Sequence, residues 1–271
     1  MSLWIILLIL LLLFVFLCHP SLNYKKVEAW RTQRFAHRGL HDAENGIIEN
    51  TLPAFRAACE KGYGIELDIQ FSKDFQVVVF HDDDLLRLTG DPRMVCELTL
   101  DELRSLRLDG VESARIPTLR EVLDTVNGTA PLLIELKSGK NNARLCEALM
   151  GHLKDYRGRY VIESFNPMIV FWFRRHAPQI IRGQLVCAMK DYLPTVNKIG
   201  AFCMAGLLLN CLGRPDFVAY DGNAQRFFSP HFQRFMFHTP MAAWTVADED
   251  LAALVDHRHE MCIFERIRPN P

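Results

Sequence analysis

The sequence predicts an α/β protein folded as a TIM-type (β/α)8 barrel. Eight β-rich runs alternate with helical patterns along the part of the chain that follows residue 32. Eight strands with intervening helices in about 240 residues match the size of such a barrel. A doubly wound open sheet is the alternative, but neither a G-x-G-x-x-G segment nor a Walker loop follows any of these runs. The closed barrel is therefore the favoured fold.

The expected strands and helices can be placed by residue number. The β-rich runs lie at 33–37, 64–69, 132–137, 159–164, 180–186, 216–220, 241–246 and 261–265. Clear helical patterns lie at 51–61, 118–126, 141–155, 166–176 and 248–257. Thr99 and Thr118 each stand three residues before a glutamate, which is the spacing of a capping box at a helix start.

An additional β-rich run at 77–80 follows the second strand closely, after the polar turn of residues 72–75. This closeness predicts a hairpin rather than a ninth barrel strand. Residues 84–117 then show little strand character. We expect them to form a small insertion over the C-terminal face of the barrel, where an insertion would help to build a pocket.

The apolar residues 1–18 predict an N-terminal transmembrane helix. Residues 3–17 contain no polar side chain, and a helix of 18 residues is about 27 Å long, against roughly 30 Å for a bilayer core. A secretory signal peptide is less favoured, because no basic residue precedes the run and no A-x-A-like site follows it. A buried core helix is the third alternative. Four basic residues follow the run, so we expect a single-pass anchor with the catalytic part in the cytoplasm.

The rest of the chain is expected to be a linker, residues 19–32, and one domain, residues 33–271. The formal net charge is −1, from 31 basic and 32 acidic residues, so no global positive field would attract a nucleic acid. None of the eight cysteines forms a C-x-x-C motif, and most lie among apolar residues. We interpret them as reduced thiols.

Carboxylates occupy one face of the second and third barrel strands. Glu66 and Asp68 alternate with apolar residues, and the run at 132–137 repeats this pattern with Glu135 and Lys137. Helices cover the outside of a barrel, so the charged side chains are expected to point inward. Buried carboxylates are costly unless they are paired or bound to a metal. Glu66, Asp68 and Glu135 therefore predict an oxygen site for one divalent metal, Mg²⁺ or Ca²⁺.

Two histidines follow β-rich runs directly. His37 ends the first run, and His81 follows the hairpin strand. Strand ends on the catalytic face of a barrel are where acid and base groups are displayed, and two imidazoles can serve as acid and base near neutral pH. Arg38, next to His37, offers a planar fork for phosphate oxygens.

Eight short motifs, taken in order, resemble those of the glycerophosphodiester phosphodiesterase family. They are H-R-G at 37–39, E-N-T at 49–51, E-L-D at 66–68, H-D at 81–82, I-P-T-L at 116–119, E-L-K at 135–137, S-F at 164–165 and W-T-V at 244–246. The similarity runs from about Phe35 to Arg268. It implies a TIM barrel with a small insertion after the H-D motif. It also implies metal-dependent hydrolysis of glycerophosphodiesters to glycerol 3-phosphate and an alcohol.

The resemblance also implies roles for individual residues. These are metal ligation by Glu66, Asp68 and Glu135, acid and base catalysis by His37 and His81, and substrate contacts by Arg38, Asn50 and Lys137. Trp244 would pack either against the substrate or in the core. The chain departs from the family at Ile48, where a proline is usual, and at Glu265, where an aspartate is common.

Two other functions remain as alternatives. A lysophospholipase D-like activity on membrane lipids is favoured by the apolar N-terminus and by the apolar stretch at 201–209, which is read either as a greasy loop or as a barrel helix. An inactive phosphodiester-binding module is disfavoured, because the three acidic residues and both histidines are present. The sequence leaves open which histidine is the base, and whether water or the glycerol 2-hydroxyl attacks.

Overall fold

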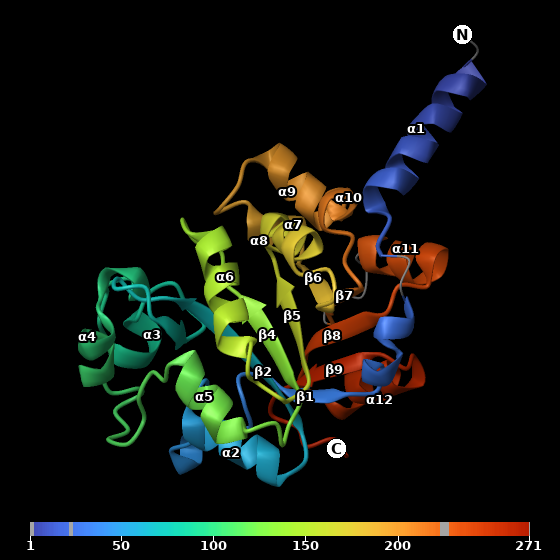
Figure 1. Cartoon of the computed structure of the whole chain (residues 1–271). Helices are drawn as coiled ribbons and strands as arrows, with labels where there is room; N and C mark the ends of the chain where they lie inside the picture. The colour runs from blue at the N-terminus through green and yellow to red at the C-terminus, as the bar shows by residue number, and fades with distance from the viewer. Residues whose placement is uncertain (1–2, 22–23, 223–227, 271) are drawn as a thin grey trace.

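Eight parallel strands close into a barrel in the computed structural model, which describes residues 3–21, 24–222 and 228–270 (Figure 1). The barrel strands are β1 (Arg34–Ala36), β2 (Gly64–Phe71), β4 (Leu132–Leu136), β5 (Tyr160–Ser164), β6 (Arg182–Val186), β7 (Phe217–Asp221), β8 (Met241–Val246) and β9 (Met261–Phe264). Strand β1 pairs with both β2 and β9, which closes the sheet. The predicted TIM-type barrel is confirmed, and every predicted strand is present.

Helices cover the outside of the barrel. They are α2 (Leu52–Glu60), α5 (Leu119–Val126), α6 (Asn142–Leu153), α7 (Pro167–His176), α8 (Met189–Tyr192), α9 (Lys198–Ala205), α10 (Asn210–Gly213), α11 (Phe228–Phe237) and α12 (Glu249–His257). The outward side chains of β2, Ile65, Leu67 and Ile69, are fully buried beneath this layer. The five predicted helices are confirmed, and α9 shows that the stretch at 201–209 begins as a helix.

The hairpin and the insertion follow β2. Strand β3 (Val77–Val79) pairs antiparallel with β2, as predicted. The insertion contains α3 (Leu86–Thr89), the 3-10 turn η4 (Val95–Glu97) and α4 (Leu100–Ser105), packed around an apolar cluster of its own. Both predicted capping boxes are present. The backbone N–H of Thr99 and that of Thr118 each donate to the glutamate three residues later, at 2.8 Å.

Apolar side chains fill the N-terminal end of the barrel interior. Phe35 and Phe217 are completely buried, and each ring lies over a glycine of the neighbouring strand. A Cβ on Gly64 would clash with the ring of Phe35, and one on Gly183 would clash with Phe217. Trp30, from the 3-10 turn η2 (Glu28–Trp30), stacks on Phe35 with ring centroids 6.2 Å apart and covers this end.

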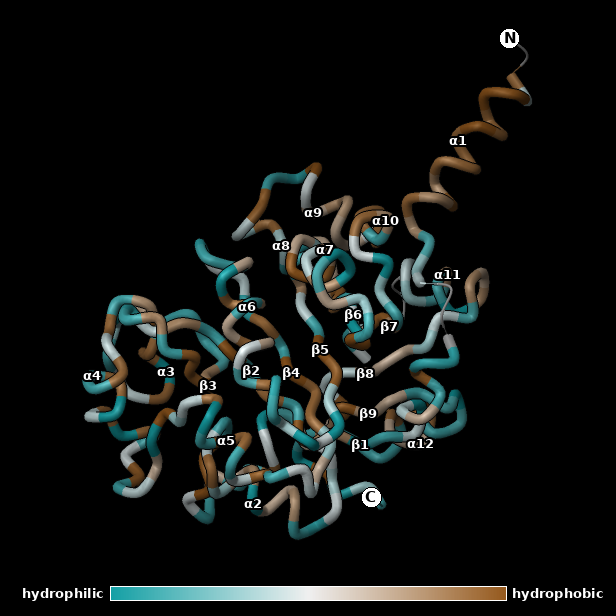
Figure 2. The backbone as a smooth tube through the Cα atoms, viewed as in Figure 1, coloured by the Kyte–Doolittle hydropathy of each residue, from teal (hydrophilic) through white to brown (hydrophobic). Residues whose placement is uncertain are grey.

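Helix α1 (Leu3–Cys18) projects from the barrel and is apolar along its length (Figures 1 and 2). Its last turns pack on the barrel layer, where Phe14 contacts Phe232 of α11 and Cys18 is buried. Within the described part of the chain, no helix combines the length and the apolarity needed to cross a bilayer. The structure therefore does not support the transmembrane span predicted for residues 1–18, since the 16-residue helix ends at a side chain packed in the protein.

Candidate active site

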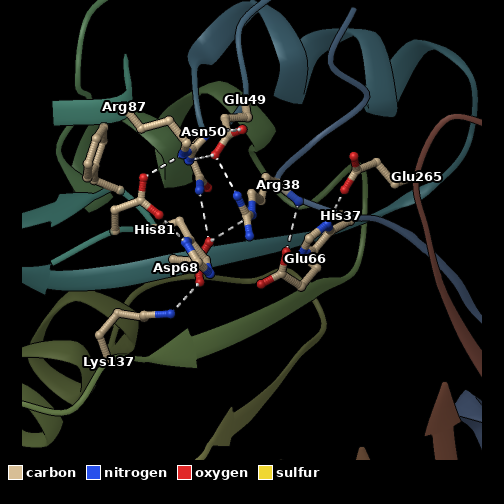
Figure 3. Close-up of polar contacts among 12 residues, drawn as sticks. His37, Arg38, Glu49, Asn50, Glu66, Asp68, His81, Arg87, Lys137 and Glu265 are labelled. Atoms are coloured by element: carbon tan, nitrogen blue, oxygen red, sulfur yellow. Dashed lines mark hydrogen bonds and ion pairs between the residues drawn. The ribbon is translucent and has the colours of Figure 1, made fainter. Parts of the chain in front are cut away.

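Three carboxylates meet inside the barrel, towards the C-terminal ends of its strands. Glu66 and Asp68 point inward from β2, and Glu135 points inward from β4, where it is the direct neighbour of Asp68. All three side chains are buried, and each offers an oxygen within 4.8 Å of the others. The alternation of apolar and acidic residues in the two strands thus brings the predicted metal ligands together, and Figure 3 shows two of them, Glu66 and Asp68.

Burial and mutual repulsion dominate the electrostatics of this cluster. Burial raises the pKa of Glu66 well above its ordinary value, and the charges of Asp68 and Glu135 raise it further. Burial also raises the pKa of Glu135, against the opposing charge of Lys137. For Asp68 the effect of burial is outweighed by Lys137 and other nearby cations, which hold its pKa below the ordinary value. A further positive charge would therefore stabilise the ionised cluster.

Polar groups from three other segments contact the carboxylates. The backbone N–H of Arg38 donates to Glu66 at 2.8 Å, and the Asn50 side-chain amide donates to Asp68 at 2.9 Å. Both Arg38 and Asn50 have positive φ, 55° and 54°, so tight turns aim these donors at the cluster. Lys137 Nζ lies 3.0 Å from Glu135 and 3.4 Å from Asp68. The lysine predicted to contact phosphate thus lies against two of the predicted metal ligands.

The insertion reaches the site through Arg87 of α3. Arg87 donates to both carboxylate oxygens of Glu49, at 2.7 and 2.9 Å, and to Asp82 at 2.7 Å. Glu49 in turn accepts from Arg38 Nη1 at 2.7 Å. These ion pairs connect the predicted phosphate-binding arginine to the acid beside His81. Arg38 Nε has no hydrogen-bond partner among the described residues and lies 3.9 Å from Asp68.

His37 forms a dyad with Glu265. Its Nδ1 lies 2.7 Å from the Glu265 carboxylate, which fixes that nitrogen as the N–H donor and leaves Nε2 as the acceptor. Burial lowers the pKa of His37, although the hydrogen bond to Glu265 opposes this shift. The same hydrogen bond lowers the pKa of Glu265 to about 2. The departure from the family at position 265 therefore retains an acid that orients the imidazole.

His81 forms a second dyad with Asp82, at 2.7 Å between Nδ1 and the carboxylate. Burial acts to raise the pKa of Asp82, but the hydrogen bonds from His81 and Arg87 outweigh it and hold the pKa below its ordinary value. Figure 3 shows His37 beside Glu66 and His81 beside Asp68, so the two imidazoles flank the acidic cluster.

Trp244 of β8 points into the barrel. Its ring meets Phe165 edge-on with centroids 5.6 Å apart, and it packs against the apolar interior. The indole Nε1 is buried and has no hydrogen-bond partner within the described residues. The ring is thus packed as a core aromatic, while its one donor is left unused.

Glu163 is a site residue that the sequence reading missed. It lies on β5 directly beside Glu135, is 1% exposed, and its Oε2 has no partner among the described residues. Burial raises its pKa well above the ordinary value, and the charges of Glu135 and Asp68 add to this shift. The alternation of β5 could have indicated this position, because Glu163 stands two residues after Val161 and therefore points to the same, inward face.

The cluster fits a divalent cation. Three hard oxygen donors lie close together and are buried, and the charges of Asp68 and Glu135 raise the pKa of Glu66. Such a set of hard oxygen donors is what Mg²⁺ and Ca²⁺ prefer. Fold and site together define a barrel enzyme whose C-terminal strand ends carry a carboxylate cluster flanked by two imidazoles.

Comparison with known proteins gives the family. The sequence pattern of the glycerophosphoryl diester phosphodiesterase family matches residues 37–263, which are most of the chain. The chain belongs to this family, and the prediction of a phosphodiesterase is thereby confirmed. A glycerophosphodiester phosphodiesterase of Caldanaerobacter subterraneus subsp. tengcongensis is 36% identical over 165 residues, covering 57% of this chain and 67% of that protein.

Two further similarities are informative. A lysophospholipase D of Rattus norvegicus is 32% identical over 162 residues, covering 55% of this chain and 49% of that protein, so the match spans about half of the rat sequence. The structure of an Oleispira antarctica phosphodiesterase in complex with the product sn-glycerol-3-phosphate aligns with a TM-score of 0.67 and 24% identity. That alignment covers 86% of this chain and 92% of the other, and it shows a shared fold.

Proposed function

We propose that the protein hydrolyses glycerophosphodiesters to glycerol 3-phosphate and an alcohol, using one divalent metal. The observation that carries the proposal is the buried cluster of Glu66, Asp68 and Glu135 with an imidazole on either side. Each imidazole is oriented by its own carboxylate, at 2.7 Å in both dyads. Phosphodiester hydrolysis needs these groups, because a negative centre must be neutralised while one proton is removed and another is supplied.

Glu66, Asp68 and Glu135 would hold the metal. When bound, Mg²⁺ or Ca²⁺ would neutralise phosphate oxygens and stabilise the charge that develops in the transition state. Lys137 supports this arrangement in two ways. It offsets the repulsion between Glu135 and Asp68, and it adds positive charge beside the phosphate.

His37 suits the role of general base. Its lowered pKa keeps the imidazole neutral near pH 7, and the hydrogen bond to Glu265 leaves the Nε2 lone pair free to accept a proton. His81 would then protonate the leaving alkoxide, with Asp82 stabilising the imidazolium. The attacking group is water, or the glycerol 2-hydroxyl by way of a cyclic phosphate. Trapping a cyclic phosphate product would separate these two routes.

Arg38 would contact the phosphate, because its buried Nε is unpaired and faces the cluster. Asn50 would support the site by holding Asp68. Trp244, which is only partly buried, would pack against the glycerol or alcohol moiety.

A product assay on the purified full chain tests the proposed function. The substrates are glycerophosphocholine, glycerophosphoethanolamine, glycerophosphoglycerol and a lysophospholipid, each with Mg²⁺ and with Ca²⁺. We expect release of glycerol 3-phosphate from at least one of the first three. Absence of product from all three, with the folded protein and either metal, would contradict the proposal.

Lysophospholipase D-like activity is the second candidate. A lysophospholipid is a glycerophosphodiester that keeps one acyl chain, so the same residues could release its headgroup alcohol. The support is the exposed apolar helix α1 and the name of the rat relative. A faster rate on lysophosphatidylcholine than on glycerophosphocholine would favour this candidate.

We further propose that α1 attaches the protein to a membrane, with the barrel on the cytoplasmic side. Every side chain from Leu3 to Leu13 is at least 38% exposed and apolar, which is costly in water. The basic residues that follow α1 support the orientation. In vesicle flotation, the charged double variant L8D/L11D should lose binding, whereas the apolar control L8A/L11A should retain it. Equal flotation of the two variants would contradict attachment through α1.

A further inference from the structure

A basic pocket lies at the root of α1, at the opposite end of the barrel from the carboxylate cluster. Its volume is about 480 Å³, and Arg174, Arg182 and Arg214 line it together with Phe16 and His19. Arg174 is in the last turn of α7, and Arg182 is the first residue of β6. Arg214 follows α10 and precedes β7. The pocket therefore belongs to the N-terminal face of the barrel, and no residue of the proposed catalytic site lines it.

The arginines are held in place with only part of their donor capacity. Arg182 donates hydrogen bonds to the Asp216 carboxylate, at 3.3 Å, and to two backbone carbonyls. Arg174 uses Nη1 for two carbonyls at the end of α10, both at 2.8 Å. Arg214 uses Nη1 for the carbonyls of Phe16 and His19, at 3.0 and 2.6 Å. The Nε and Nη2 groups of Arg174 and Arg214 have no hydrogen-bond acceptor within residues 3–21, 24–222 and 228–270.

Positive charge in the pocket exceeds negative charge. Asp216 is the one carboxylate in ion-pair contact with these arginines in the described chain, and it pairs with Arg182. Burial lowers the pKa of both Arg182 and Arg214, and the nearby charge of Arg174 lowers each of them further. Two guanidinium groups thus face the pocket without a counter-ion among the residues that the structure describes. An anion with several oxygens would satisfy the unused donors and relieve this repulsion.

We propose that this pocket binds a phosphate monoester, and that the headgroup of an anionic lipid is its source. Arg174 and Arg214 each present a free Nε–Nη2 edge, which matches two oxygens of one phosphate. The pocket wall continues into α1, where the ring of Phe16 lies 4.8 Å from the Arg214 guanidinium. An acyl chain could follow the apolar surface of α1 while its phosphate occupies the pocket. The choice of a lipid source rests on the proposed attachment of α1, whereas the phosphate site itself does not.

The surrounding surface supports a negatively charged partner. A second pocket on the same end of the barrel is lined by Arg31, Arg234 and Arg258, with Glu260 as its acidic member. The chain as a whole carries a net charge of −1. Basic side chains are thus gathered at the N-terminal face of the barrel, where Glu28 pairs with Arg31 and Glu260 with Arg234. Such a face is suited to the negative potential of an anionic lipid surface.

The test uses the full chain and a double variant, R174Q/R214Q, which removes both free guanidinium edges. The control is R175Q, because Arg175 is exposed and adjacent but does not line the pocket. The single variant R174Q guards against misfolding of the double variant, since Arg174 is exposed. The hydrolysis rate of glycerophosphocholine should match the wild type in every variant, because the catalytic residues lie at the other end of the barrel. Thermal unfolding shows how far the loss of the carbonyl hydrogen bonds of Arg174 and Arg214 lowers stability.

Two binding measurements follow. Flotation compares vesicles of phosphatidylcholine with vesicles that contain phosphatidic acid, a monoester, or phosphatidylglycerol, a diester, at matched surface charge. We expect wild type and R175Q to prefer phosphatidic acid, and R174Q/R214Q to lose that preference by about tenfold. Calorimetric titration with inorganic phosphate and with glycerol 3-phosphate provides the second arm. Binding at the catalytic site is common to all variants, so a difference between them belongs to the pocket.

The outcomes separate the site from its source. A phosphatidic acid preference that the double variant loses supports the site with a lipid ligand. Weaker titration by the double variant, without any lipid preference in the wild type, supports the site with a soluble phosphate ligand. If neither the wild type nor any variant floats, the proposed attachment through α1 is wrong. The titration with phosphate and glycerol 3-phosphate then tests the phosphate site by itself. The proposal is overturned if R174Q/R214Q equals the wild type in both measurements.

Discussion

The two ends of the barrel are built from the same strands but are filled differently. At the N-terminal end, Phe35 and Phe217 pack against glycines, Trp30 stacks on Phe35, and the space is apolar and closed. At the C-terminal end, the same inward phase carries Glu66, Asp68 and Glu135, which are buried at a cost in free energy. The N-terminal end therefore stabilises the fold, and the C-terminal end carries the charged groups of the proposed reaction. A change in the filling of the apolar end should therefore alter stability and leave turnover unchanged, and a change at the acidic end should do the reverse.

Neutralising the acidic cluster should have the largest effect. We expect Glu66→Gln, Asp68→Asn or Glu135→Gln to lower kcat/KM by on the order of 10³-fold or more, because the proposed metal loses a ligand. The melting temperature of Glu66→Gln and of Glu135→Gln should be unchanged or higher, since a repelling buried charge is removed. That of Asp68→Asn should fall, since Asp68 is paired with Lys137. Calorimetry and the glycerol 3-phosphate assay check both expectations. A variant that unfolds at lower temperature and keeps its activity would reverse the assignment of the two ends.

Truncation at the apolar end should act on stability alone. Phe217→Ala removes a fully buried ring and should lower the free energy of unfolding by about 3–5 kcal/mol. Turnover of the molecules that remain folded should equal the wild type, because Phe217 lies at the end opposite the cluster. Denaturant unfolding gives the stability, and active-site-normalised assays give the turnover. A comparable fall in turnover would show that the two ends are coupled.

Removing either imidazole should lower activity without loss of fold. His37→Ala and His81→Ala should each lower kcat by on the order of 10²-fold, which is typical of a lost acid or base. Circular dichroism and thermal unfolding serve as the folding controls. Wild-type turnover in one of these variants would remove that histidine from the proposed acid–base pair.

The Glu265 dyad should give the smallest effect and a pH signature. Glu265→Gln should lower kcat by about tenfold, and Glu265→Asp should restore part of it, because the carboxylate orients His37. The folded-state pKa of Glu265 is about 2, below its ordinary value of 4.5, so its stabilisation is present above pH 4.5 and is lost as the pH falls towards 2. Melting curves of wild type and Glu265→Gln should therefore differ by about 1–2 kcal/mol at pH 6 and converge near pH 2. A gap that is independent of pH would contradict the dyad.

The sequence predicts the strands and the inward carboxylates, because a period of two fixes which face a side chain joins. It does not predict partners that meet only when the barrel closes. Arg87 reaches Glu49 and Asp82 from the insertion, and Glu265 reaches His37 from the residue that follows the last strand. The basic pocket is likewise invisible, because α7, the start of β6 and the segment after α10 meet at the root of α1 only in the folded chain.

At the N-terminus, the sequence does not predict which part of α1 packs against the rest of the protein. The apolar run predicts a helix, and the structure confirms one, but packing at Phe14 and Cys18 takes its last turns into the protein surface. Hydropathy counts apolar residues without showing which of them other side chains cover. The predicted membrane span is therefore not supported, while the predicted helix is confirmed.

The most direct test of the account measures glycerol 3-phosphate release from glycerophosphocholine before and after removal of divalent metal. The purified full chain is treated with EDTA, assayed, and assayed again after addition of Mg²⁺ or Ca²⁺. We predict that activity falls to background in EDTA and returns with at least one of the two metals, while Glu135→Gln stays inactive throughout. Full activity in EDTA would contradict the claim that the carboxylate end of the barrel works through a bound metal.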